Sequence, residues 1–272
     1  MADKFGIKKV YRTIGKEWFC KWDEGPQRSV SFGAAGELDP DLIFRGNGSY
    51  TIYGGSRDRC GQMRVTGDCP RIYVRFSDEE SDALSPSVPK WDNVEVTFYA
   101  LTTNPGRKVS YAGIEAVVRT NHFPDDKLCS TRGYGGKVNF DGRVRFEKEC
   151  CHGKGNKQTT PVYPFANKGR MPLNKWIGYK LISRACEKNT KNKLELYMDM
   201  TDGSNGGTWT KVSEFVDYDG WSADTPSCCD LHKGKVLLPP HFTNTYSVYL
   251  RSDGLGEQFY KKLSIREVAP LN

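Results

Sequence analysis

Six segments of this chain place a charged or aromatic polar residue at every second position, and this alternation constrains the fold more than any other feature. In an extended strand, successive side chains point to opposite faces, so each segment fits a strand with one apolar and one polar face. Glu195, Tyr197 and Asp199, for example, alternate with leucine and methionine. The predicted strands are residues 113–121, 143–151, 176–184, 194–200, 246–253 and 260–267.

The rest of the sequence also predicts strands. Residues 94–101 (VEVTFYAL) alternate cleanly and should bury Val94, Val96, Phe98 and Ala100. Residues 63–76 predict two short strands broken at 67–70, and the strand at 260–268 should lie near the N-terminal region. No amphipathic helix is apparent. Many strands at short spacing predict an all-β sandwich of two antiparallel sheets with little helix.

Length and composition favour one domain over residues 1–272, since sandwiches often exceed 200 residues and nothing here resembles a linker. The net charge of +7 comes from scattered residues, without a long basic block, a phosphate-binding loop or an apolar run of membrane length. We therefore expect a monomer that binds neither nucleic acid nor membrane. A mildly positive field favours an acidic partner such as a uronic-acid polymer.

Nine cysteines without a CxxC motif indicate disulfides, with Cys60–Cys69 the favoured pair. The alternative is a zinc site built from the two Cys-Cys doublets and nearby histidines: Cys150, Cys151, His152, Cys228, Cys229 and His232. The first residues, MADKFGIKK, lack the apolar stretch of a signal peptide. Either the protein stays inside the cell or a leader has been removed, and the cysteines favour a secreted protein.

Several stretches of the second half resemble concanavalin A-like jelly rolls. They are Trp176-Ile177-Gly178-Tyr179-Lys180, residues 194–199 (LELYMD), residues 207–214 (GTWTKVSE) and residues 246–267. The resemblance covers roughly residues 90–268 and is nearest to secreted members of uncertain activity. It implies a jelly-roll fold. It also implies a polysaccharide ligand, because the superfamily includes glucanases, alginate and glucuronan lyases, and carbohydrate-binding modules.

The motifs of individual activities are incomplete. Jelly-roll alginate lyases carry a Q-[IV]-H strand that this chain lacks, and Glu115 and Arg119 stand where their first motif would lie. The glucanase pattern E-x-D-x-x-E is interrupted because Tyr197 takes the place of the middle Asp between Glu195 and Asp199. The resemblance therefore predicts the fold more specifically than the activity.

Cleavage of an acidic glycan by β-elimination is the favoured function. It needs a cation to neutralise the uronate, a base to take the α-proton and an acid for the leaving oxygen. The candidates are Arg119, Arg145, Lys180 or Arg251 for the cation, His122 or His152 for the base, and Tyr197 or Tyr249 as acid/base. We assign the catalytic roles to Arg119, His122 and Tyr197, with Glu147 beside them. Each histidine could instead be a hydrogen-bonded loop residue, and each tyrosine a packing residue of the sheet.

Two other functions stay open. The second choice is a non-catalytic carbohydrate-binding protein, in which Trp91, Trp176, Trp209 and Trp221 are either stacking platforms or core residues. The third is a glycoside hydrolase with a carboxylate pair such as Glu147 and Glu149. No cofactor is expected to be required, although a structural calcium ion could bind loop carboxylates such as Asp39 and Asp41.

The polar strand faces are either the solvated outside of a sandwich or one groove for an extended ligand. We expect the groove, because isolated exposed ion pairs add little stability and do not explain so dense an array. Substrate-binding positions in it are predicted to be Glu115, Asn121, Arg145, Glu149, Lys180, Glu195, Tyr249 and Arg251.

Overall fold

The computed structural model describes residues 1–31, 41–55, 58–74, 91–107, 109–122, 131–150, 156–166, 169–221, 235–237 and 247–271. Apart from one short 3-10 turn, η2 (Ser204–Gly206), the regular elements of these residues are strands, and none is a helix long and apolar enough to span a membrane. The strands are β1 (Thr13–Phe19), β2 (Arg28–Val30), β3 (Leu42–Tyr53), β4 (Gln62–Val74), β5 (Val94–Asn104), β6 (Gly113–Thr120), β7 (Gly133–Asn139), β8 (Val144–Glu149), β9 (Asn156–Gln158), β10 (Ile177–Cys186), β11 (Lys191–Asp199), β12 (Thr210–Asp217), β13 (Ser247–Asp253) and β14 (Glu257–Val268).

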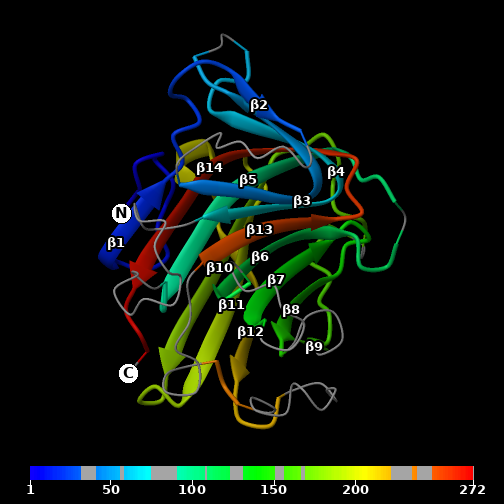
Figure 1. Cartoon of the computed structure of the whole chain (residues 1–272). Coiled ribbons are helices and arrows are strands. Elements are labelled where there is room, and N and C mark those ends of the chain that lie inside the picture. The colour runs from blue at the N-terminus through cyan, green and yellow to red at the C-terminus, as the bar shows by residue number, and fades with distance from the viewer. Residues whose placement is uncertain are drawn as a thin grey trace.

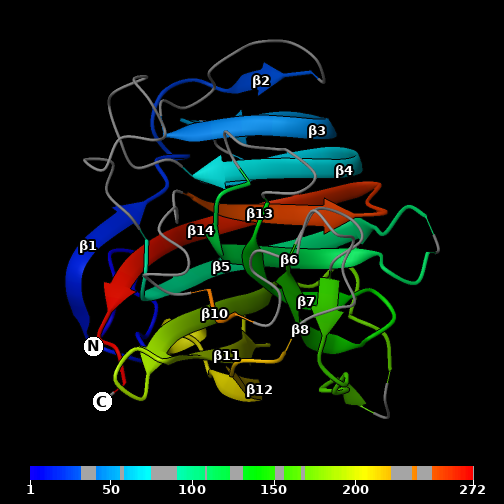
Figure 2. The same ribbon diagram turned by 60° about the horizontal axis from the view of Figure 1, so that its bottom comes forward.

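The strands form one antiparallel, hydrogen-bonded sheet that curls into two layers (Figures 1 and 2). We call β12, β11, β10, β5, β14 and β1 layer A, and β2, β3, β4, β13, β6, β7, β8 and β9 layer B. The layers join where β14 pairs with β4. The side chain of Tyr179 in β10 links the two layers. Its hydroxyl donates to the carbonyl of Gly136 in β7 and accepts from the N–H of Ala116 in β6 (3.3 Å). The predicted jelly-roll sandwich with little helix is confirmed.

The core lies between the layers and follows the predicted alternation. Val94, Val96, Phe98 and Ala100 of β5 are fully buried, as the sequence predicts. They pack in one cluster with apolar residues of both layers, including Ile114, Val138, Phe146, Leu181 and Leu196. Polar residues at the intervening positions therefore point outward from whichever layer carries them.

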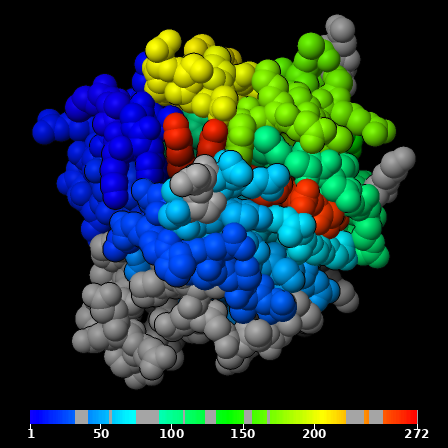
Figure 3. All heavy atoms as spheres, turned by 90° about the horizontal axis from the view of Figure 1, so that it is seen from above, coloured from blue at the N-terminus to red at the C-terminus, as the bar shows by residue number. Residues whose placement is uncertain are grey.

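The end of the chain lies near its beginning, as predicted. β14 pairs with β1 from Ser264↔Phe19 to Val268↔Thr13. The first residues also contact the loop that contains η2, where the N–H of Lys8 donates to the carbonyl of Gly206 (2.8 Å). In Figure 3 the N-terminal residues (dark blue) lie beside the yellow residues that include this loop.

The segment predicted as two short strands is instead the single strand β4. Its register against β3 shifts between Asn47 and Ser49, so a bulge at Gly67 and Asp68 interrupts the pairing without ending the strand, and Pro70 still pairs with Gly46. This continuity makes the predicted Cys60–Cys69 disulfide wrong, because Cys60 lies in the turn before β4 and the extended residues from Gln62 to Cys69 span about 20 Å. Cys60 is an exposed thiol and Cys69 a partly buried one.

The other cysteine and metal predictions are only partly covered by the described residues. Cys20, Cys150 and Cys186 are buried cysteines that form no disulfide within the described residues. The remaining predicted positions lie outside these residues: Cys129, Cys151, His152, Cys228, Cys229, His232 and Asp39. Asp41 accepts a hydrogen bond from the indole N–H of Trp18 (2.8 Å). Within the part of the chain that the structure describes, no group of three or more His, Cys, Asp or Glu could hold a metal ion.

Candidate functional site

The outer face of layer B carries one row of charged residues that crosses six adjacent strands. Each residue of this charged row is the register partner of the next, and one side of a sheet therefore presents all of them. At ~4.8 Å between strands the row spans about 24 Å. In order from β3 to β8 it consists of Arg45, Arg71, Arg251, Glu115, Lys137 and Arg145.

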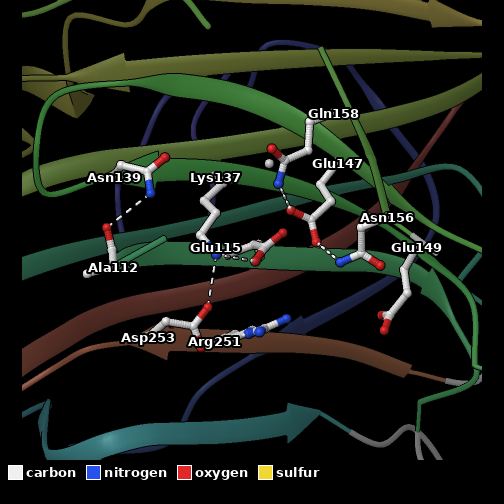
Figure 4. A network of polar contacts seen from close by, with 12 residues as sticks. Ala112, Glu115, Lys137, Asn139, Glu147, Glu149, Asn156, Gln158, Arg251 and Asp253 are labelled. Atoms are coloured by element: carbon white, nitrogen blue, oxygen red, sulfur yellow. Dashed lines mark hydrogen bonds and ion pairs between the residues drawn. The ribbon is translucent and has the colours of Figure 1, made fainter. Parts of the chain in front are cut away.

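The middle of the charged row is a buried ion network. Lys137 Nζ lies 2.9 Å from Asp253 Oδ2 and 3.7 Å from Glu115 Oε2, and Arg251 Nε donates to Asp253 Oδ1 (2.9 Å). Figure 4 shows Lys137 between the two carboxylates. Burial raises the pKa of Glu115 to about 7, although Lys137 opposes the shift. The pKa of Asp253 falls to about 2 because Arg251 and Lys137 outweigh its burial.

The ends of the charged row are more accessible. Arg45 is exposed, and Arg71, Arg251 and Arg145 are partly exposed. Arg71 donates to Cys69 Sγ (2.9 Å). Within the described residues neither Arg71 nor Arg145 lies within 4 Å of a carboxylate oxygen, so two guanidinium groups of the row lack an anionic partner.

An aromatic cluster lies beside the charged row, two residues further along strands β4 and β13. The rings of Tyr73 and Tyr249 are 4.9 Å apart, and His122 lies 5.1 Å from Tyr249. His122 Nδ1 is 3.3 Å from the Tyr73 hydroxyl, and its Nε2 is 3.9 Å from Glu149 Oε2. The Tyr249 hydroxyl is buried without a hydrogen-bond partner in the described chain, and burial raises its pKa well above the ordinary value.

Gly135 leaves space on this face for the side chains of neighbouring strands. It lies in β7, where it pairs with Val117 of β6 on one side and with Glu147 of β8 on the other. A Cβ atom at Gly135 would overlap the Glu115 carboxylate, so a side chain there would displace Glu115 from Lys137. A glycine-rich strand thus leaves space for the buried charges of its neighbours.

Six predicted site residues lie on this outer face, and His122 borders it. The six are Glu115, Arg145, Glu147, Glu149, Tyr249 and Arg251. Glu147 accepts hydrogen bonds from Asn156 and from Gln158 (2.7 Å), whereas Glu149 faces His122, so the two carboxylates have separate partners (Figure 4). Asn121 instead holds the backbone, because its Oδ1 accepts from the N–H of Arg132 (2.7 Å).

The predicted position of Arg119 is wrong. Its φ is +49°, and the register of β6 against β13 shifts between Ser247 and Tyr249, so a bulge turns Arg119 away from the outer face. Its guanidinium lies between the layers, where it donates to Ser183 Oγ (3.2 Å) and Asn93 Oδ1 (3.0 Å). A side chain that points between the layers cannot contact a ligand on the outer face.

The predicted single groove is also wrong, because Lys180, Glu195 and Tyr197 lie on the outer face of layer A. Lys180 bonds Glu95 Oε1 (2.7 Å) and Thr97. Glu195 bonds Arg184 (3.1 Å) and Tyr11, whose ring lies 3.5 Å from the Arg184 guanidinium and covers part of this face. The curl of the sheet places the core between these residues and the charged row.

The four tryptophans considered as stacking platforms divide between the core and the outer face of layer A. Trp91 and Trp221 are buried. Trp209 and Trp176 are partly exposed, but Lys180 and Lys261 each lie 4.2 Å from the ring centre. None belongs to the charged row, so stacking platforms for a ligand on that row must come from other residues.

Sequence reasoning missed Arg71, Tyr73 and Lys137. Arg71 and Tyr73 alternate with Ile72 and Val74, which is the same signal that identified the other strands. Lys137 lies in a glycine-rich strand without a continuous apolar face, and such a stretch resembles a loop.

No protein-family model matches this chain, and no curated protein is similar to it. Among solved structures, the chain is similar to a Bacillus subtilis protein of unknown function with a galectin-like fold (10% identity, 93% of this chain and 100% of that one, TM-score 0.48). It is also similar to peanut lectin (8%, 89% and 98%, 0.42) and to lectin II from Ulex europaeus (9%, 88% and 97%, 0.41). At these identities the similarity concerns architecture and says nothing about a ligand.

Proposed function

We propose that the outer face of layer B binds an acidic polysaccharide along the charged row. The observation that carries this proposal is a cross-strand row of five cations, two of which lack a carboxylate partner in the described chain. Guanidinium groups bind carboxylates and sulfates with paired hydrogen bonds. A row about 24 Å long suits an extended polymer better than a compact ligand.

The partial exposure of the row sets the geometry of binding. Arg45, Arg71, Arg251 and Arg145 reach the surface, whereas Lys137 and Glu115 are buried beneath them. The polymer therefore crosses the strands over the arginines, and the buried Lys137–Asp253 pair holds Arg251 in place. This arrangement supports binding more directly than cleavage.

Replacing Arg71 or Arg251 with alanine should weaken binding of a soluble polyuronate about tenfold at low salt, since a charge-assisted contact contributes on the order of 1.4 kcal/mol. The effect should shrink as salt is added. Isothermal titration calorimetry with a polyuronate and with a neutral glucan measures the loss of affinity and its salt dependence. Arg12→Ala, which removes an exposed arginine outside the row, is the matched control. Equal losses in all three variants, or equal binding of the neutral glucan, would contradict the proposal.

A second candidate function is β-elimination on the same face, favoured by the unpartnered Tyr249 hydroxyl beside Arg251 and His122. In this proposal Arg251 neutralises the uronate, His122 takes the α-proton, and Tyr249 protonates the leaving oxygen. The Tyr249 hydroxyl is protonated at neutral pH, as a proton donor must be, although burial raises its pKa and makes it a weaker acid than an exposed tyrosine.

If the chain cleaves polyuronate, the absorbance of unsaturated product will appear, and Tyr249→Phe will reduce its rate by about a hundredfold or more while polymer binding persists. Tyr197→Phe, on the outer face of layer A, should leave the rate unchanged. Binding by the wild type without any absorbance change would exclude elimination and leave the binding function intact.

A further inference from the structure

One buried lysine–aspartate pair plays no part in the charged row. Lys148 is in β8 of layer B and points inward, and Asp217 ends β12 of layer A. Both side chains are completely buried. The pair bridges the layers at a point where β8 and β12 approach each other without pairing as strands.

The contact between them is close but poorly hydrogen-bonded. Lys148 Nζ lies 2.8 Å from Asp217 Oδ2, yet the amine makes no hydrogen bond of acceptable geometry and Asp217 Oδ1 accepts none in the described chain. The Tyr134 hydroxyl donates to Asp217 Oδ2 and accepts from the N–H of Leu237 (2.9 Å). The rings of Trp221 and Tyr134 lie 5.8 and 6.0 Å from the amine, so its surroundings are largely apolar.

A second completely buried lysine pair, Lys180–Glu95, differs in this respect. Lys180 is also completely buried, but it donates to Glu95 Oε1 (2.7 Å) and to Thr97 Oγ1 (2.7 Å). Two buried charges are stable as an ion pair when additional hydrogen bonds satisfy them. Lys180 meets that condition and Lys148 does not.

We propose that Lys148 and Asp217 condense into an intramolecular amide that covalently joins β8 to β12. One proton passes from the ammonium group to the carboxylate, and the neutral amine attacks the carboxyl carbon. The new C–N bond forms, a C–O bond breaks, and the oxygen leaves as water with a second amine proton. The step needs no oxidant, reductant or other reactant.

The surroundings favour each part of this step. Burial favours the neutral forms of an amine and a carboxyl group, and it raises the pKa of Asp217 to about 6 against the opposing effect of Lys148. The Tyr134 hydroxyl is placed to stabilise negative charge that develops on the carboxyl oxygen during attack. The amide removes two buried charges, which an ion pair would have to keep.

Mass spectrometry of the intact, denatured and reduced wild-type protein tests the proposal. The expected mass is one water below that of the sequence. A tryptic digest should contain one branched peptide holding both Lys148 and Asp217 in place of three linear peptides (146–148, 149–154 and 212–233), because the amide also blocks cleavage after Lys148. A mass equal to the sequence mass, or a water loss that maps elsewhere, would overturn the proposal whatever the variants do.

Three variants sharpen the test. Lys148→Arg and Asp217→Ala should each show the full mass of their own sequence, because one reacting group is missing. Lys180→Arg replaces a second completely buried lysine and should still lack one water. Loss of the branched peptide in Lys180→Arg, from protein that is folded by circular dichroism, would contradict the assignment to Lys148.

Discussion

Asp199→Ala is expected to destabilise the protein by about 3–4 kcal/mol, because it leaves several buried donors without an acceptor. The Asp199 carboxylate is completely buried. It accepts from the N–H groups of Thr201, Gly203 and Thr208 (2.9 Å each), from the Thr201 hydroxyl (2.6 Å) and from the Tyr99 hydroxyl (2.8 Å). One side chain thus holds the loop of η2 against β5 and β11.

Urea unfolding at neutral pH measures this loss. Asp202→Asn neutralises an exposed carboxylate of the same loop, which pairs with Lys261 at the surface, and asparagine tolerates the φ of +57° at this position. It should change stability by about 0.5 kcal/mol or less. Similar losses in the two variants would show that the buried hydrogen bonds of Asp199 do not organise the loop.

The charge state of Asp199 adds a pH signature. Burial alone would raise its pKa, but the hydrogen bonds from Thr201, Thr208 and Tyr99 outweigh burial and lower it. A carboxyl group with a lowered pKa contributes stability above its unfolded-state pKa of 3.8, and this contribution is lost as the pH falls through the folded-state value. The difference between wild type and Asp199→Ala should therefore narrow in acid.

Glu115 should give the opposite pH dependence of stability, with a change of about 3 kcal/mol in the free energy of unfolding. Its pKa rises from 4.5 to about 7, chiefly through burial, with Lys137 and Arg251 opposing and Glu147 and Asp253 reinforcing the shift. Between these pKa values the folded state binds more protons than the unfolded state. The Glu115 contribution therefore falls as the pH rises from about 4.5 to 7.

The comparison with Glu115→Gln isolates this effect, because glutamine is neutral at every pH and the contributions of other groups cancel. The stability of the wild type relative to Glu115→Gln, from urea unfolding, should decrease between pH 4.5 and 8. Glu257→Gln is the control, since hydrogen bonds from Thr103 and Arg64 lower the pKa of Glu257. Its contribution to stability is lost only as the pH falls below 4.5, so the stability of the wild type relative to Glu257→Gln should stay constant between pH 4.5 and 8. Parallel profiles for wild type and Glu115→Gln would mean that Glu115 is ionised when folded.

Local alternation determined most of what the sequence could predict about the fold. The side chains of a strand alternate because of backbone geometry alone, so the buried Val96 and Phe98 and the outward Glu115, Glu147 and Arg251 could be assigned without knowing any neighbour. The same rule missed Lys137, whose strand is rich in glycine, because Gly133, Gly135 and Gly136 carry no side chains to alternate.

Tertiary structure alone decided which polar faces meet. Alternation cannot tell on which side of a curled sheet a strand will lie, so Glu195 and Glu115 have similar patterns and yet face away from each other across the core. The bulge that turns Arg119 inward depends on the register of β6 with β13. The alignment of Arg71, Arg251 and Lys137 depends on two further pairings, of β4 with β13 and of β6 with β7. Pairing joins residues far apart in the chain, and its register is therefore a property of the whole fold.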